Sequence, residues 1–400
     1  MNNWLPLIAT LSIQAMVAMA LLTLPVMAPV AAKALQVSPA LVGMYVAVTY
    51  LGAMLASLIS GTTVARWGAI RVSQWGLWLC AAGLVLCAVP WLPSVAVGAF
   101  LIGLGYGPIT PASSHLLART TPAHQMALVF SIKQTGVPVG AMVAGAVVPS
   151  LLLLLDWQVT LLVVALVCSA SALLSETIRA EFDLDLNPES KLDWGSLIFP
   201  IRMVLSHRPL ATMAACSFMF SMAQMSLMTY LVTYLHEDLS YTMVSAGLYL
   251  SVTQIGGIGG RIAWGYVADR WLGAQPTLVL LAGSMAVSAF ATAVFLPLIS
   301  TWAVWIILFV FGASAIGWNG VYLAEVARQA PAGHASTATG GTLAITFLGV
   351  VIGPPLFGML STVFGTYSAG YLALVPTSTL CGLVLFFNHR QQTRSKIQVN

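Results

Sequence analysis

Two positively charged side chains, Lys133 and Arg261, stand inside long apolar stretches of the sequence. Placing such a group in hydrocarbon costs about 2.5–3.5 kcal/mol, so each should face a partner or a polar cavity. Neither has an obvious acidic partner nearby. An arginine fork can grip a carboxylate through two parallel hydrogen bonds, and a lysine supplies a mobile point charge. The chemistry that these residues favour is the binding of a small anion.

Polar and aromatic side chains recur at helical spacing around these cations. Gln254 precedes Arg261 by seven residues and shares its face of a helix. Trp318 and Tyr322 lie one turn apart. Each polar group could instead hold neighbouring helices together. The candidate substrate-binding residues are Arg261, Lys133, Gln254, Trp318, Asn319, Tyr322, Tyr106, Thr110, Gln224 and Gln14.

The amino-acid composition indicates the kind of protein that holds these side chains in place. Of the 400 residues 59% are hydrophobic and 6% are charged, and the mean hydropathy is +0.93. Soluble proteins carry roughly 25% charged residues, so most of this surface must meet lipid. The 15 Lys and Arg residues form no basic stripe, which argues against nucleic acid as a partner. The five cysteines are isolated in apolar runs. We therefore expect no metal, no cofactor and no catalytic residues, and a protein that is not an enzyme.

Glycine, proline and charged residues cut the apolar sequence into about twelve segments of roughly 20 to 28 residues. As helices these segments are long enough to cross ~30 Å of hydrocarbon. The first lacks a positively charged leader and a cleavage site, so we expect it to be a retained helix. The predicted fold class is all-α integral membrane, with twelve transmembrane helices. The predicted spans are 6–30, 39–60, 72–92, 95–118, 126–154, 157–178, 209–235, 242–267, 276–297, 302–327, 336–362 and 367–388.

Lysine and arginine predict the orientation of these helices. Cytoplasmic loops of membrane proteins carry an excess of both residues. With both termini in the cytoplasm, the outer loops hold only Lys33. The inner loops and tail then collect Arg66, Arg71, Arg119, Arg179, Lys191, Arg202, Arg208, Arg270, Arg328, Arg390, Arg394 and Lys396. We expect an integral protein of a bacterial inner (cytoplasmic) membrane with cytoplasmic N- and C-termini.

The two halves of the sequence repeat one another. An offset of 204 positions places Gly52 on Gly256 and Ser57 on Arg261, and an offset of 209 places Gly103 on Gly312. A polar stretch separates the halves. The predicted organisation is an N-terminal six-helix bundle (1–178), a cytoplasmic linker (179–208), a C-terminal six-helix bundle (209–388) and a cytoplasmic tail (389–400). Two pseudo-symmetric six-helix bundles are the architecture of an alternating-access transporter.

The stretch from Gly265 to Gly273 (GYVADRWLG) resembles the loop signature of the major facilitator superfamily, and the resemblance extends over essentially the whole chain. The first-half copy has Ala65 where the signature has an acid. In the family, this acid and its arginines hold the cytoplasmic side shut. Leu116 stands at the position equivalent to Glu325, so the first-half latch is expected to be weak. The gating residues implied are Asp269, Arg270, Glu325, Arg328 and Arg66, although these charges could simply anchor helix ends.

The position of Arg261 strengthens the resemblance to the organic-anion branches of this superfamily. It lies eight residues before Asp269, the spacing of the substrate-binding arginine in oxalate/formate exchangers and monocarboxylate carriers; cyanate/nitrate-type porters are a further comparison. In the family fold the fifth and eighth helices are adjacent, which implies that Lys133 and Arg261 share a cavity wall. In a structural alternative, Arg261 reaches toward Asp269 or Glu325, and Lys133 extends to the cytoplasmic face.

The function predicted is secondary active transport of a small anion, chiefly a carboxylate, by alternating access. Carrying one negative charge inward against the membrane potential costs about 2.3 kcal/mol per 100 mV, which proton symport or anion exchange would offset. Glu325 and His115 are the proton-coupling candidates, although His115 points about 140° away from Thr110 and could be a packed helix-interface residue. The alternatives are a proton-coupled drug exporter and a non-transporting receptor or scaffold. The expected partners are the anion, a proton or counter-anion and the lipid bilayer, with a monomeric chain.

Overall fold

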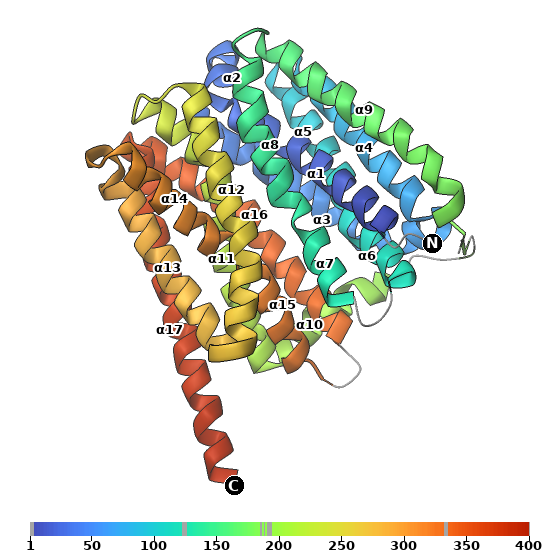
Figure 1. The fold of residues 1–400 in the computed structure, drawn as a ribbon, viewed down its shortest axis with the longest axis vertical. Helices are drawn as coiled ribbons and strands as arrows, with labels where there is room; N and C mark the ends of the chain where they lie inside the picture. Colours follow the sequence, from blue (N-terminus) through green and yellow to red (C-terminus); the bar gives the residue numbers. More distant parts are fainter. Residues whose placement is uncertain are drawn as a thin grey trace. The chain divides into compact units, whose positions relative to one another are not determined.

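The computed structural model describes residues 4–121, 126–184, 186–187, 189, 194–331 and 335–399, and all regular structure in these ranges is helical (Figure 1). The helices are α1 (Trp4–Val26), α2 (Ala28–Leu35), η1 (Pro39–Leu41), α3 (Val42–Trp67), α4 (Ala69–Cys87), α5 (Leu92–Tyr106), α6 (Ile109–Thr120), α7 (Met126–Gln134), α8 (Gly136–Leu151), α9 (Trp157–Phe182), α10 (Trp194–Ser206), α11 (Arg208–Glu237), α12 (Met243–Val267), η3 (Ala268–Leu272), α13 (Ala274–Val294), η4 (Leu296–Leu298), α14 (Thr301–Ala315), α15 (Asn319–Gln329), α16 (Ala335–Phe364) and α17 (Tyr367–Val399).

Eleven helical segments in the described part of the chain are long and apolar enough to cross a membrane. They correspond to eleven of the twelve predicted spans. The twelfth is α12, which is 25 residues long but carries Gln254, Arg261 and several glycines. Large apolar side chains cover much of the surface, as in Trp302 and Leu166, which are 80% and 69% exposed. The fold is that of an all-α integral membrane protein, as predicted.

The chain divides into two compact units. Unit 1 comprises Met1–Leu192 and Leu231–Ser251, and unit 2 comprises Asp193–Tyr230 and Val252–Asn400. Within unit 1, α4 packs between α5 and α9, and α1 packs against α8 (Figure 1). Within unit 2, α13 packs along α17.

The sequence repeat reappears as equivalent packing inside each unit. In unit 1, a Cβ atom on Gly103 of α5 would overlap the backbone oxygen of Thr49 on α3. In unit 2, a Cβ atom on Gly312 of α14 would overlap the backbone oxygen of Thr253 on α12 in the same way. Small residues allow helix backbones to approach this closely in membranes. The two helix pairs are therefore built to the same plan.

Three predicted spans are interrupted helices, which the sequence analysis had treated as continuous. The span 95–118 breaks between α5 and α6 at Gly107–Pro108, and 302–327 breaks between α14 and α15. The span 126–154 breaks at Thr135. Pro138 lacks a backbone N–H and so cannot bond the carbonyl of Gln134, which is where α7 ends. Each break frees backbone groups that must find other partners in a membrane.

Candidate functional site

Arg261 of unit 2 lies at the break between α14 and α15. Its Nε–H donates to the backbone oxygen of Ile316, at a distance of 3.2 Å. Ile316 is the C-cap residue that directly follows α14. The carbonyl groups at a helix end have no partner in their own helix, so this contact satisfies one of them. The contact also fixes the direction of the guanidinium group. Arg261 therefore points toward an interrupted helix, the kind of element that forms ion and substrate sites in transporters.

Gln254 lies on the same face of α12 as Arg261 and is fully buried. Within the described residues, neither Oε1 nor Nε2 of Gln254 has a hydrogen-bond partner. A buried polar group without a partner costs about 1–3 kcal/mol, so such groups are rare unless water or a ligand completes them. The amide is therefore placed as a donor and acceptor for a bound molecule or for water.

An aromatic and amide cluster surrounds the start of α15. Trp318 Nε1 donates to Gln224 Oε1 across 2.9 Å, and Asn319 Nδ2 lies 3.4 Å from the same oxygen. The ring of Trp318 packs against Phe220 and Tyr322, with centroids 5.3 Å and 5.2 Å away. The structure thus brings together four predicted site residues. Phe220 is a member of this cluster that was not predicted, although it lies four residues before Gln224 on the same face of α11.

A second polar contact joins predicted residues in unit 1. Thr110 Oγ1 on α6 donates to Gln14 Oε1 on α1, at 3.2 Å. Gln14 is fully buried, and its Nε2 has no partner among the described residues. The backbone of Gly136, at the start of α8, packs against the side chain of Gln14. Three helices, α1, α6 and α8, therefore meet at the side chain of Gln14. Tyr106 lies nearby in sequence and packs edge-on against Tyr50, with centroids 5.8 Å apart.

Lys133 is fully buried in the last turn of α7. The apolar cluster of Leu7, Leu117 and Val129 anchors α7 against α1 and α6. A buried lysine at a helix break fits the prediction that this cation belongs to a site. Lys133 belongs to unit 1 and Arg261 to unit 2, so their expected common wall stays a prediction.

The predicted gating residue Glu325 forms a buried network in unit 2. Its carboxylate is 1% exposed and pairs with Arg328 Nη2 across 2.7 Å. Gln275 Nε2 on α13 donates to Glu325 Oε1 at 2.9 Å, and Gln329 Nε2 donates to the same oxygen. His389 Nδ1 on α17 lies 3.1 Å from Gln275 Oε1 and extends the network to a third element. The predicted gating residues were all charged side chains, so Gln275 and His389 were not among them.

The other predicted gating charges lie outside this network. Asp269 and Arg270 are exposed in the π-helical turn η3, and no ion pair in the described ranges joins either to Glu325 or Arg328. Arg66 of unit 1 stacks over the ring of Trp67, 5.4 Å from its centroid. Their gating role stays a prediction.

In unit 1, the region equivalent to the Glu325 network is packed by apolar side chains. Leu116, at the position equivalent to Glu325, lies in an apolar cluster with Ile70 and Phe182. Asp183 follows α9 and accepts hydrogen bonds from the backbone N–H groups of Ile70 and Arg71, both at 2.9 Å. An acid from elsewhere in the chain therefore caps α4, in the half whose loop signature lacks its own.

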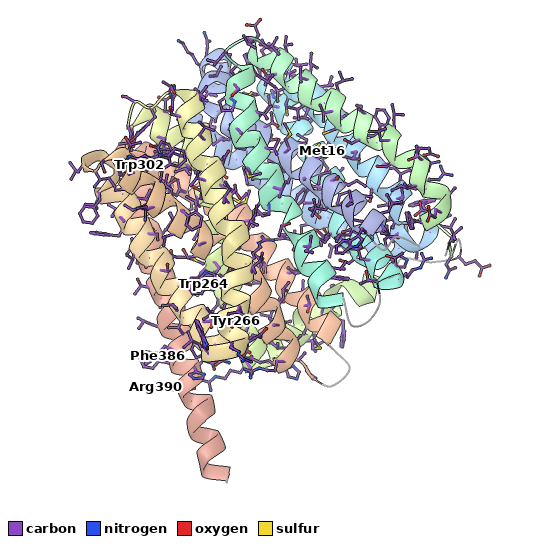
Figure 2. All side chains as sticks on the ribbon, in the orientation of Figure 1. Met16, Trp264, Tyr266, Trp302, Phe386 and Arg390 are labelled. Atoms are coloured by element: carbon purple, nitrogen blue, oxygen red, sulfur yellow. The ribbon has the colours of Figure 1, made fainter. Side chains whose placement is uncertain are left out.

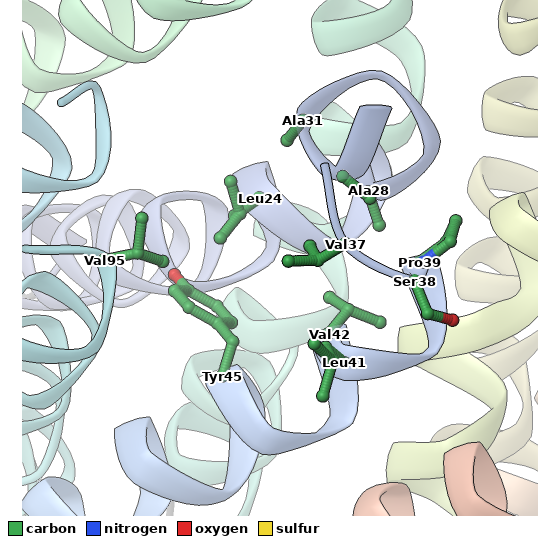
Figure 3. Close-up of a pocket in the computed structure, with 11 residues that line it drawn as sticks. Leu24, Ala28, Ala31, Val37, Ser38, Pro39, Leu41, Val42, Tyr45 and Val95 are labelled. Atoms are coloured by element: carbon green, nitrogen blue, oxygen red, sulfur yellow. The ribbon is translucent and has the colours of Figure 1, made fainter. Parts of the chain in front are cut away.

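A small cavity in unit 1 lies apart from all these residues (Figure 3). It holds about 60 Å³ and is lined mainly by apolar side chains such as Leu24, Val42 and Val95. Tyr45 points into it and donates its hydroxyl to the backbone oxygen of Leu21 at 3.2 Å. Ligand pockets are usually about 300–1,000 Å³, so this cavity is too small for an organic substrate.

The fold and the sequence agree on the family. The chain superposes on the nucleoside transporter NupG with a TM-score of 0.80 at 14% identity, covering 95% of this chain and 99% of that one. It also superposes on a D-xylose–proton symporter with a TM-score of 0.75 at 15% identity, covering 96% of each chain. The sequence model of the Major Facilitator Superfamily matches residues 8–344. The chain belongs to the Major Facilitator Superfamily. It is a secondary transporter of this type, embedded in a membrane.

Curated relatives within the superfamily include transporters of organic anions. The gentisate transporter of Corynebacterium glutamicum is 24% identical over 82% of this chain and 74% of its own length. The cis,cis-muconate transport protein of Acinetobacter baylyi is 25% identical over 87% of this chain and 86% of its own. An uncharacterised superfamily transporter of Mycobacterium tuberculosis is 26% identical over 76% of this chain, and the match spans 65% of that protein's length. These relatives agree with the predicted resemblance to the organic-anion branches.

Proposed function

We propose that this chain carries a small organic carboxylate across a bacterial inner membrane, with both termini in the cytoplasm. The observation that carries the proposal is the placement of Arg261 at the α14/α15 break, on the helix face that also holds Gln254. A guanidinium group has five N–H donors, and the Nε contact to Ile316 uses one of them and orients the fork. The relatives named for gentisate and cis,cis-muconate support an organic anion as the substrate.

The aromatic cluster favours a substrate with an organic body over a simple inorganic ion. Trp318 and Tyr322 are each 1% exposed and present ring surface beside the amides of Gln224 and Asn319. Binding sites for organic molecules combine such apolar walls with a few fixed polar groups. A nitrate or cyanate ion would gain little from the rings. An aromatic or unsaturated carboxylate would use both the rings and the cation.

The coupling follows from charge. Inward movement of an anion against the potential must be offset by a proton or by exchange for another anion. Glu325 accepts hydrogen bonds from Gln275, Arg328 and Gln329, the acceptor-only role of an ionised carboxylate. This arrangement favours a structural latch over a proton carrier. Symport fits a proton that is carried by the substrate itself or by the half-buried side chain of His115. Anion exchange requires no proton-carrying side chain.

Uptake by purified protein in liposomes tests the proposal, with radiolabelled benzoate as the first probe. We expect accumulation that is accelerated either by an inward proton gradient or by unlabelled benzoate inside the vesicles. The variant Arg261→Gln should lose uptake by roughly tenfold to a hundredfold, since a hydrogen-bonded charge pair is worth on the order of 1.5–3 kcal/mol. The matched control Arg202→Gln, an exposed arginine on α10, should transport normally. Wild-type uptake by Arg261→Gln, or transport of lipophilic cations but of no carboxylate in a panel, would overturn the proposal.

A further inference from the structure

A groove separate from the candidate transport site lies in unit 2 between the start of α11 and the later turns of α17. It encloses about 380 Å³. None of the candidate substrate-binding residues lines it. Its lining residues are Arg208, Thr212, Leu380, Leu383, Val384, Phe387, Asn388 and Gln391. The packing of Cys381 against Cys216, whose backbone oxygen lies 3.8 Å from the Cys381 sulfur, holds the two helices together nearby.

The wall formed by α17 changes from apolar to polar along its length. The six lining residues from Leu380 to Gln391 recur at intervals of three and four, so they share one face of the helix. This face runs for about 16 Å at 1.5 Å per residue. The aliphatic and aromatic side chains come first, and the amides of Asn388 and Gln391 come last. Leu380, Leu383 and Phe387 are about half exposed (50%, 48% and 58%) on a helix that spans the membrane.

The polar end of the groove is equipped to bind an anion. Arg208 is exposed at the start of α11, and within the described part of the chain no carboxylate pairs with it. Asn388 Nδ2 is buried and has no hydrogen-bond partner among the described residues. Thr212 lies one turn after Arg208 on α11 and donates its hydroxyl to the Arg208 backbone oxygen at 3.0 Å. A cation and an unused amide donor therefore meet at the same end.

A second cation lies close to this end of α17. The Arg390 guanidinium stacks over the ring of Phe386, 4.5 Å from its centroid, where α17 leaves the other helices of unit 2 (Figure 2). The predicted orientation puts this end of unit 2 in the cytoplasmic leaflet. That leaflet carries anionic lipids, whose negative surface potential attracts basic residues near it.

We propose that this groove is a binding site for an anionic phospholipid. The lipid phosphate contacts Arg208 and the Asn388 amide, and the glycerol and upper acyl segments lie along Leu380, Leu383 and Phe387. The order of the lining residues matches the order of groups in a phospholipid, from chain to headgroup. A free anion would use only the polar end, and an apolar molecule would leave the Asn388 donor unpaired, at a cost.

Native mass spectrometry of the detergent-purified protein tests the lipid site directly. Phosphatidylglycerol and phosphatidylcholine with identical acyl chains are titrated in parallel. We expect phosphatidylglycerol to bind at least about tenfold more tightly, which is about 1.4 kcal/mol. Arg208→Gln should remove this preference, and Asn388→Leu should weaken it. The control Arg202→Gln, on an exposed arginine of the same unit that does not line the groove, should retain it. Equal binding of the two lipids, or an unchanged preference in Arg208→Gln, would overturn the proposal.

Two further measurements separate the alternatives. Inorganic phosphate at millimolar concentration should not displace phosphatidylglycerol from the wild type; displacement would identify a simple anion site and refute the lipid assignment. Thermal unfolding without added lipid should give the same Tm for wild type and Arg208→Gln, which establishes that the variant is folded. With that established, a rise in Tm on adding phosphatidylglycerol is expected for the wild type alone, and an equal rise in the variant counts against the site.

Discussion

Ser57 Oγ donates to the backbone oxygen of Gly107 across 3.0 Å, and Gly107 is the C-cap residue that follows α5 at the break to α6. The same relationship recurs in unit 2, where Arg261 Nε donates to the backbone oxygen of Ile316, the C-cap residue that follows α14. The sequence offsets that align the two halves pair Ser57 with Arg261 and Gly107 with Ile316. In both units, the side chain at this position therefore satisfies a backbone carbonyl at a helix break. Arg261 retains that contact and adds a cation that Ser57 does not provide.

This equivalence suggests a substitution that separates the structural role of Arg261, its hydrogen bond to Ile316, from its proposed role in substrate binding. In Arg261→Ser, we expect the hydroxyl to take over the bond to Ile316, as Ser57 does in unit 1, so that the Tm stays close to that of the wild type. Arg261→Ala should lower stability by about 0.5–1.5 kcal/mol, the net value of one hydrogen bond. Both variants should lose carboxylate uptake. Transport at the wild-type rate by Arg261→Ser would mean that the position is structural only.

The sequence was sufficient for the membrane class and the repeat, because hydropathy and the paired glycines are local properties of the chain. The helix breaks escaped prediction although Gly107–Pro108 marked one of them, because a transmembrane segment keeps its hydropathy when its backbone hydrogen bonds are interrupted. The pairing of Gln224 with Trp318 also could not be foreseen, since the two residues lie on helices far apart in sequence. Charge patterning found Glu325 and Arg328 but not the neutral Gln275 that orients the carboxylate.

Glutamine substitutions at Glu325 and at Glu176 compare the stability contributed by a buried and by an exposed glutamate. Glu325 is 1% exposed and holds donors from Gln275, Arg328 and Gln329. Glu325→Gln replaces one acceptor oxygen with a donor, so at least one of these N–H groups loses its partner, and we expect a loss of about 1–3 kcal/mol and a clear fall in Tm. The Glu176 side chain is 52% exposed in its pair with Arg179, and Glu176→Gln should leave the Tm unchanged. Equal effects in the two variants would contradict the assignment of a buried latch to Glu325.

Asp183 is expected to stabilise the start of α4. Its two oxygens accept the N–H groups of Ile70 and Arg71, and Gly68 at the cap position has no side chain to do so. Asp183→Ala should cost about 0.5–2 kcal/mol, the range for loss of a helix cap, and should speed proteolysis of the segment after α9. Asp156 occupies the cap position of α9 but makes no side-chain cap bond. The control Asp156→Ala should therefore leave Tm and proteolysis unchanged; a larger effect there than at Asp183 would refute the capping role.

The close helix contacts of the two units should be equally intolerant of added volume. Alanine at Gly103 or at Gly312 would put a methyl group into the backbone oxygen of Thr49 or of Thr253. We expect each substitution to cost about 1–3 kcal/mol, the usual penalty of overpacking, and to lower the Tm to a similar extent. Gly283 on α13 has open space around its Cβ position, so Gly283→Ala should be neutral or stabilise the helix by up to about 1 kcal/mol. The two contacts share one geometry, so the two variants should lose similar amounts of stability. A large fall in Tm for one variant and no change for the other would show that the repeated contact stabilises the two units unequally.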